Sequence, residues 1–498
     1  MTGFTAADFD RVRAAARDTL AVHQLPGLCI GIVRGNDLVF AESFGCAQIE
    51  SKQPMDLTRR QCIASITKTM VGLCTMALVD EGRLRLDDRV VDLLPEIELL
   101  PTIELLPAIG RDGPAQTMTI WHLLTHTAGI GEAPTQDMLA AAINPDAAAR
   151  REPGSFATLY EHGIAIEYEP GTKWHYANHG FNLLGEIIQR SEKSELADVM
   201  QRRIFGPLGM TDTDLLGESH PRLATPYHRA PSEDTRAQLT RAGIPIPDEA
   251  TIDGLNIRGS FGGELNKAAL AAGGVQSTIP DMARYASALL RRGGGIVRPE
   301  TFAAMIAPQY CPNPRMTHWG LSLARVPFGE RVLIGHGGAY FGGWNSSLEI
   351  LPGENLAVLQ HMNVMLANPR PAFDHVMRAV LDVQPAAVAE CAIDARILET
   401  APGTYELTPG RLSNFRPATG IGRIQIERDG QALHLRSRWG AWKSGVRMIA
   451  CDDSDRSFFA LKAEDGEVSH VALTRDSAGG VTGLRCDRLV QMVRKAAS

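Results

Sequence analysis

The sequence predicts a mixed α/β domain followed by a smaller all-β domain. Strand-like apolar runs and helical stretches both occur through residues 1–385, whereas short strand-like runs divided by Asp-Gly and Gly-Gly turns fill residues 396–498. The Ala-rich segment 386–395 separates the two patterns and is expected to be a linker. A chain of 498 residues is also longer than a single domain usually is. We therefore expect two domains, the second an antiparallel barrel or sandwich.

The elements of the first domain follow from its apolar patterns. The first twenty residues predict an amphipathic helix, and a hairpin is expected where a Gly-, Asn- and Asp-containing turn joins strands at 27–33 and 38–44. Residues 64–81 predict a helix, because apolar side chains recur there at steps of three and four. Helical stretches and Gly- and Pro-rich loops alternate over 114–290, which indicates a helical subdomain within about 90–290. The remaining expected elements are strands at 332–336 and 346–351 and a closing helix at 373–383.

Composition excludes several classes of protein. The net charge is −7 and acidic and basic residues are mixed along the chain, so no basic footprint for a nucleic acid is expected. The apolar runs are too short to span a bilayer. The first twenty residues carry charges throughout and have no apolar core, unlike a secretory signal, and the 8 cysteines are dispersed like reduced thiols. These features favour the cytoplasm; the periplasm stays open if a signal peptide has been removed.

One short motif carries recognisable chemistry. Ser65-Ile66-Thr67-Lys68 has the pattern S-x-x-K, and residues three apart are neighbours on one helix face. A lysine amine that loses its proton can activate the hydroxyl, and the free N–H groups of a helix N-terminus can stabilise an oxyanion. Taken alone, the pattern equally fits an N-cap Ser followed by a solvated Lys. Further motifs are needed to decide between the two readings.

Two further motifs follow in order, Tyr176-Ala177-Asn178 and His336-Gly337-Gly338. With them the chain resembles the serine β-lactamase and penicillin-binding-protein-like family, particularly its class C, esterase and D-aminopeptidase branches. Those enzymes share S-x-x-K, then Y-x-N, then K-T-G or H-x-G. The flanking segments 123–130, 207–213 and 272–278 agree with this resemblance, which covers about residues 15–385.

The resemblance implies a role for each motif residue. Ser65 would attack a carbonyl and form an acyl-enzyme, while Lys68 and Tyr176 would share the work of base and proton shuttle. Which of the two takes the Ser65 proton stays open. Asn178 would bind the substrate amide. The backbone N–H groups of Ser65 and Ala339 would form the oxyanion hole.

The third motif also sets the expected substrate. His336 stands where lactamases and D,D-peptidases usually have a Lys facing the substrate carboxylate. A near-neutral imidazole binds a carboxylate less strongly, so lactam hydrolysis is expected to be weak or absent. Gly337 and Gly338 would let a substrate backbone approach the strand closely. We expect cleavage of amide or peptide bonds in small or linear peptides, including D-residues, with carboxylesterase activity or a non-catalytic binding role as alternatives.

The resemblance also implies the architecture and the partners. It implies a β-lactamase/transpeptidase-like fold, in which helices flank an antiparallel sheet next to a helical subdomain, and a lipocalin-like barrel at the C-terminal end. A small-molecule or peptide substrate is the expected partner, and a homo-oligomer stays open. No metal or cofactor is expected, because the histidine pairs 122/126 and 175/179 lack the Glu of H-E-x-x-H. Lys443-Ser444-Gly445 also spells K-S-G, but we expect a surface turn of the second domain there.

Overall fold

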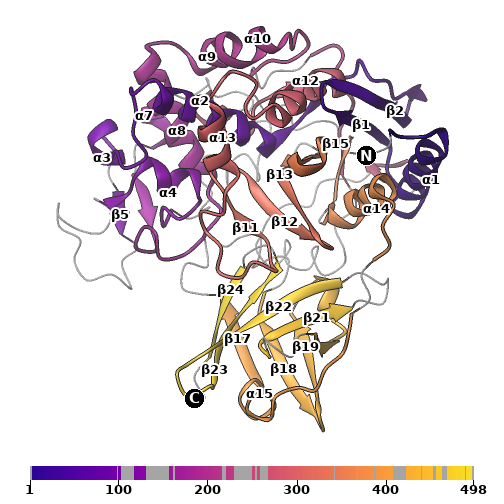
Figure 1. The fold of residues 1–498 in the computed structure, drawn as a ribbon, viewed down its shortest axis with the longest axis vertical. Coiled ribbons are helices and arrows are strands. Elements are labelled where there is room, and N and C mark those ends of the chain that lie inside the picture. Colours follow the sequence, from indigo (N-terminus) through magenta and orange to yellow (C-terminus); the bar gives the residue numbers. More distant parts are fainter. Residues whose placement is uncertain are drawn as a thin grey trace.

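A computed structural model gives the architecture of most of the chain. The residues that it describes are 3–97, 99–101, 117–130, 156–160, 163–215, 220–228, 250–252, 255–257, 267–340, 343–366, 368–385, 388–407, 422–438, 440–451, 456–462, 468–487 and 490–495. Figure 1 shows a larger sheet-and-helix part, which contains the N-terminus, above a smaller barrel, at whose end the C-terminus lies. The predicted order of an α/β domain and an all-β domain is confirmed.

An antiparallel sheet organises the larger part, which we call the sheet domain. Its eight described strands lie in the order β11-β12-β13-β14-β15-β1-β2-β3. Their bounds are β1 Gly27–Arg34, β2 Asp37–Gln48, β3 Gln53–Pro54, β11 His318–Trp319, β12 Ala324–Phe328, β13 Arg331–Tyr340, β14 Trp344–Leu351 and β15 Leu356–Met362. The first and last parts of the domain therefore meet in the middle of the sheet, where β15 pairs with β1 and also with β14.

Helices cover both faces of this sheet. On one face α1 (Ala6–Val22) and α14 (Arg370–Leu381) pack side by side and share an apolar core with β1 and β15. On the other face α12 (Ile279–Leu290) packs on β1 and β15, next to the buried helices α2 (Thr67–Asp80) and α8 (Asn178–Glu192). Capping side chains stabilise the N-termini of two of these helices. Thr5 and Asp8 form a capping box at α1, and the Thr278 hydroxyl caps α12.

A helical region joins the sheet to the rest of the domain. Its other described helices are α3 Val90–Leu93, α4 Ile120–Leu124, α7 Phe156–Leu159, α9 Leu196–Met200, α10 Gly206–Leu208 and α13 Pro299–Ile306. Short strand pairs connect its loops: β4 (Gln61–Cys62) with β10 (Gln276–Ser277), β5 (Leu99–Pro101) with β6 (Ile164–Ile166), β7 (Tyr227–His228) with β16 (Val364–Met365), and β8 (Ala250–Ile252) with β9 (Leu255–Ile257). In the pair β4–β10, β4 lies directly before the turn that carries Ser65.

The C-terminal part is a closed antiparallel barrel, as the resemblance implied. Its described strands are β17 Gly403–Leu407, β18 Ile424–Asp429, β19 Ala432–Ser437, β20 Val446–Ala450, β21 Phe458–Lys462, β22 Val468–Arg475, β23 Val481–Cys486 and β24 Val490–Arg494. β17 closes the barrel by pairing with β24. Its apolar core includes Tyr405, whose hydroxyl donates to the Ala401 carbonyl just after α15 (Ala395–Thr400).

Contacts between side chains of the described residues join the barrel to the sheet domain. The Arg485 guanidinium on β23 donates a hydrogen bond of 3.3 Å to the Tyr310 hydroxyl, and the Arg315 guanidinium lies 4.1 Å from the centre of the Phe458 ring. Helix α14 ends at Leu381 and α15 begins at Ala395, and the domain limits at 385 and 396 stay predictions. Among the described residues, no helix has both the length and the apolar character needed to cross a membrane.

Candidate active site

The predicted nucleophile sits on a strained turn between a strand and a buried helix. β4 ends at Cys62, a single 3₁₀ turn covers Ala64–Ile66, and α2 begins at Thr67. The sequence predicted one helix from residue 64; the observed helix is preceded by this tighter turn. Ala64 has φ +48°, a left-handed conformation that a residue with a Cβ rarely adopts. Such strain is frequent at functional positions, and here it lies directly before Ser65.

Ser65 and Lys68 meet as their spacing predicted. The Lys68 ammonium nitrogen Nζ lies 3.0 Å from Ser65 Oγ, and it also donates to the Ala272 carbonyl. Lys68 is fully buried, whereas Ser65 keeps 8% of its surface exposed. Burial removes the hydration that an ammonium group prefers, so a buried lysine acts as a base more readily than an exposed one. The reading of Lys68 as a solvated side chain is wrong.

Tyr176 approaches the same lysine from the loop before α8. Lys68 Nζ lies 5.0 Å from the centre of the Tyr176 ring and 5.7 Å from that of Phe181. Ala177 is the N-cap of α8, and Asn178 is its first residue. Tyr176 and Asn178 are both half-buried. The Y-x-N motif therefore brings its Tyr to the S-x-x-K pair and places its Asn at the adjoining helix start.

The third motif lies on β13, which runs beside the nucleophile turn. A Cβ at Gly338 would come within 2.2 Å of the Ile63 carbonyl oxygen, so only glycine permits this approach. The Ser346 hydroxyl on β14 donates to the same carbonyl at 2.8 Å. Gly337 is exposed on β13, and Ala339 follows Gly338 near the strand's end. His336 is buried, and its ring centre lies 6.0 Å from that of Tyr176.

An aromatic cluster that the sequence analysis did not predict as part of the site surrounds Tyr176. The ring of His126 lies 4.4 Å from that of Tyr176 between centres, and the ring of Trp319 lies 5.5 Å from that of His336. Trp174 contacts His126 and Trp319. Burial, followed by the nearby Lys68 charge, holds the pKa of His126 well below its ordinary value of 6.5, so its ring is neutral at neutral pH. In the sequence, His126 could have been found only through the flanking segment 123–130, which contains it and agrees with the family resemblance.

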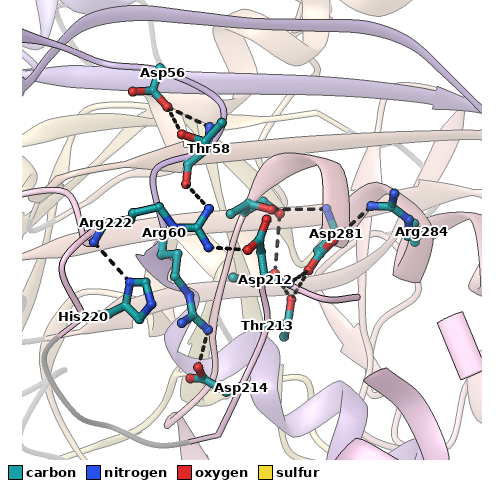
Figure 2. Close-up of polar contacts among 12 residues, drawn as sticks. Asp56, Thr58, Arg60, Asp212, Thr213, Asp214, His220, Arg222, Asp281 and Arg284 are labelled. Carbon is teal, nitrogen blue, oxygen red and sulfur yellow. Dashed lines mark hydrogen bonds and ion pairs between the residues drawn. The ribbon is translucent and has the colours of Figure 1, made fainter. Parts of the chain in front are cut away.

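A network of ion pairs lies beside β4, close in sequence to the nucleophile. Figure 2 shows its three arginine–carboxylate pairs, which are Arg60–Asp214, Arg222–Asp212 and Arg284–Asp281. We call them, with Thr213, the Arg60 network. Thr213 donates to Asp281 at 2.9 Å, and the hydrogen bond from Arg222 lowers the pKa of Asp212. Because Arg60 precedes β4, the network fixes the strand that leads to Ser65.

The spaced histidine pairs and the K-S-G segment have ordinary structural explanations. The His122 ring bonds to Thr119, the His175 ring to the Ile130 carbonyl, and the His179 ring to the Tyr160 hydroxyl. No group of three or more His, Cys, Asp or Glu suited to a metal ion occurs in the described part of the chain. Lys443 and Ser444 are exposed in a turn after a short 3₁₀ helix, as expected for a surface turn.

Comparison with known proteins gives a family match and curated relatives. The model of the family described as Beta-lactamase matches residues 12–381. Esterase EstB from Burkholderia gladioli is 29% identical over 256 residues, which are 49% of this chain and 61% of that protein. The chain thus spans about three fifths of the length of this curated relative.

Solved structures share the fold at low sequence identity. The octameric penicillin-binding protein homologue from Pyrococcus abyssi has a TM-score of 0.61 and 22% identity, and the match covers 98% of this chain and 100% of that one. The D-amino acid amidase from Ochrobactrum anthropi SV3 has a TM-score of 0.59 and 21% identity, covering 76% and 99%. At such identity these likenesses establish the fold alone.

Proposed function

Because this chain belongs to the beta-lactamase family, we propose that it is a serine hydrolase in which Ser65 forms an acyl-enzyme. The observation that carries the proposal is the distance of 3.0 Å between Lys68 Nζ and Ser65 Oγ in a buried setting. A hydroxyl at this distance from a buried amine is the arrangement that nucleophilic catalysis requires. The strained Ala64 before it also supports the assignment.

The proposed reaction has two balanced steps. In acylation, Ser65 Oγ bonds to the substrate carbonyl carbon, the bond to the leaving group breaks, and the Ser65 proton passes through Lys68 and Tyr176 to that group. In deacylation, the oxygen of a water molecule bonds to the same carbon, the bond from that carbon to Ser65 Oγ breaks, and the acid leaves while a proton of the water passes to Ser65 Oγ. Backbone N–H groups of Ser65 and Ala339 would hold the oxyanion, an assignment that the approach of β13 to the nucleophile turn supports.

Amide or peptide bonds of small or linear peptides, including those with D-residues, are the substrates that we favour. A buried imidazole at His336 supports this preference, because it offers a hydrogen bond to a substrate and no fixed positive charge to a lactam carboxylate. Asn178 and the exposed edge at Gly337 would receive the substrate backbone. Carboxylesterase activity is the second candidate. It is favoured by the likeness to an esterase across 49% of this chain.

A substrate panel with an acylating probe tests the proposal. Wild-type protein should hydrolyse members of a set of p-nitrophenyl esters, D- and L-aminoacyl anilides and linear peptides, and a fluorophosphonate should label Ser65. Ser65→Ala should abolish both turnover and labelling. Ester turnover without amide turnover would assign an esterase. A wild-type protein that neither turns over nor becomes labelled would contradict the enzymatic proposal and favour a binding role.

Self-association is a further part of this proposal. A structural relative described as octameric matches 98% of this chain, barrel included, which supports a homo-oligomer. Light scattering of the full chain gives the mass directly, and a particle of 53.9 kDa would exclude it.

A further inference from the structure

The buried histidine beside Tyr176 contacts the chain on both sides of that residue. The backbone N–H of His175 donates to the His126 carbonyl at 2.7 Å. The backbone N–H of Ala177 donates to His126 Nδ1 at 3.2 Å. One residue thus receives the amide groups immediately before and immediately after Tyr176, and its ring stacks on the Tyr176 ring at 4.4 Å with a tilt of 31°.

The His126 side chain is buried and held in an orientation in which Nδ1 accepts a hydrogen bond. It is 2% exposed, at the end of α4, in a left-handed conformation with φ +57°. His, Asn and Asp adopt this conformation more readily than other residues with a Cβ. Because Nδ1 accepts the Ala177 N–H, the ring proton must lie on Nε2. Trp174, Trp319 and Phe181 pack around the ring.

We propose that His126 is a positioning residue that fixes Tyr176 toward Lys68, an inference that rests on the proposed function of Tyr176. Without the Nδ1 acceptor, the Ala177 N–H at the N-cap of α8 would be left buried and unpaired. The backbone on the C-terminal side of Tyr176 would then be free to turn. The Tyr176 ring, now 5.0 Å from Lys68 Nζ between nitrogen and ring centre, would then shift with this backbone.

Three substitutions separate the acceptor from the ring. His126→Asn keeps an acceptor at the position of Nδ1 and tolerates the left-handed backbone, but it removes the stacked ring. His126→Phe keeps a ring and removes the acceptor. We expect kcat to fall about tenfold or more in His126→Phe and less than about threefold in His126→Asn, with KM little changed, since a buried unpaired amide is costlier than a lost ring contact. His126→Gly, which also tolerates the backbone, replaces His126→Phe if the latter does not fold.

A double-mutant cycle distinguishes positioning from general loss of stability. If His126 acts through Tyr176, His126→Phe should lower kcat less than about twofold once Tyr176→Phe is already present. A loss in the double mutant equal to the product of the two single losses would overturn the proposal. Full kcat in both His126→Phe and His126→Gly would overturn it as well.

A spectroscopic readout decides the question even if no substrate of the panel is turned over. With 3-fluorotyrosine introduced at position 176 of the full chain, ¹⁹F NMR reports the placement of that ring directly. We expect one sharp resonance in the wild type and in His126→Asn, and a broadened or split resonance in His126→Phe or His126→Gly. An unchanged sharp resonance in the variants without an acceptor would refute the positioning role and leave the proposed function untouched.

Discussion

Two buried cations lie on either side of the segment that carries the nucleophile, and they have different kinds of partner. Arg60, which precedes β4, is 3% exposed and pairs with the carboxylate of Asp214. Lys68, in the first turn of α2, is fully buried and donates to a hydroxyl and a carbonyl, both of them neutral acceptors. Arg60 is thus paired with an anion, whereas Lys68, eight positions later, is bonded to the hydroxyl of the proposed nucleophile.

The partners of a buried cation indicate its role. The carboxylate of Asp214 compensates the buried charge of Arg60, and we interpret this pair as one that holds the backbone before β4. Neutral acceptors hold an amine in place without fixing its proton. The aromatic rings of Tyr176 and Phe181 also orient the ammonium of Lys68 through cation–π contacts. These contacts agree with the proton transfer that we propose for Lys68, whereas the ion pair of Arg60 agrees with a structural role.

Removing the cation on the reactive side should give the largest effect. In Lys68→Met, a side chain of similar length fills the buried site. We expect kcat to fall by roughly 10²-fold or more, because an acid–base group is lost. The melting temperature should stay equal to that of the wild type or rise, since a buried ammonium is costly to folding. Steady-state kinetics and thermal unfolding check both statements. Lys462→Met, an exposed lysine of the barrel, is the control and should change neither quantity.

Removing the cation on the structural side should do the reverse. Arg60→Met leaves the Asp214 carboxylate without its partner, and we expect the free energy of unfolding to fall by about 3 kcal/mol. The kcat of the folded fraction should stay within about threefold of wild type. Urea unfolding and kinetics on the same sample measure the two.

The double variant Arg60→Met/Asp214→Leu is the matched control for that loss. It removes the orphaned carboxylate as well as the cation, so it should regain most of the lost stability. A double variant as unstable as Arg60→Met would mean that packing of the arginine chain, and not its charge, holds this segment. If kcat fell as far in Arg60→Met as in Lys68→Met, the distinction between a structural Arg60 and a catalytic Lys68 would be wrong.

Local geometry explains what the sequence could predict about the site. The pairing of Ser65 with Lys68 depends only on three-residue spacing within one turn and the start of one helix, so the motif sufficed. The hairpin of β1 and β2 is local in the same way, and both strands lie where the turn between them indicated. The approach of β13 could be anticipated only through family resemblance, because its partner, the nucleophile turn, lies about 270 residues earlier.

Long-range packing explains what the sequence could not predict. β15 inserts between β1 and β14 in the sheet, yet it carries the polar residues Gln360 and His361, both buried, and no alternating pattern marks it. His126 lies two residues after the end of α4 and Trp319 lies on β11, and neither has a local signal that predicts which residue it will contact. Burial of polar side chains by distant strands is set by tertiary structure, which overrides the local pattern.

Lowering the pH should destabilise the fold first through its buried histidines and only later through its ion pairs. We expect this effect to be smaller than that of either substitution above. Burial lowers the pKa of His361 on β15 from 6.5 to about 4, and the pKa of His126 is also well below 6.5. A group with a lowered pKa in the folded state leaves stability intact above its unfolded value, so stability is full above pH 6.5 and is lost as the pH falls toward 4. By contrast the pKa of Asp212 is lowered from 3.8, so the Arg60 network loses its contribution only at still lower pH.

The His361 share of this loss can be measured separately. A folded pKa of about 4 predicts that His361 alone removes about 2 kcal/mol of the free energy of unfolding between pH 7 and pH 5. In His361→Leu the stability should therefore depend less on pH over this range, by that amount, in urea unfolding followed at each pH. Part of the slope that remains there should come from His126, whose pKa is also lowered, whereas Asp212 of the Arg60 network stays charged because its pKa is lowered from 3.8. An identical slope in His361→Leu and wild type would show that the acid sensitivity arises elsewhere, and a loss confined to below pH 4 would assign it to the ion pairs.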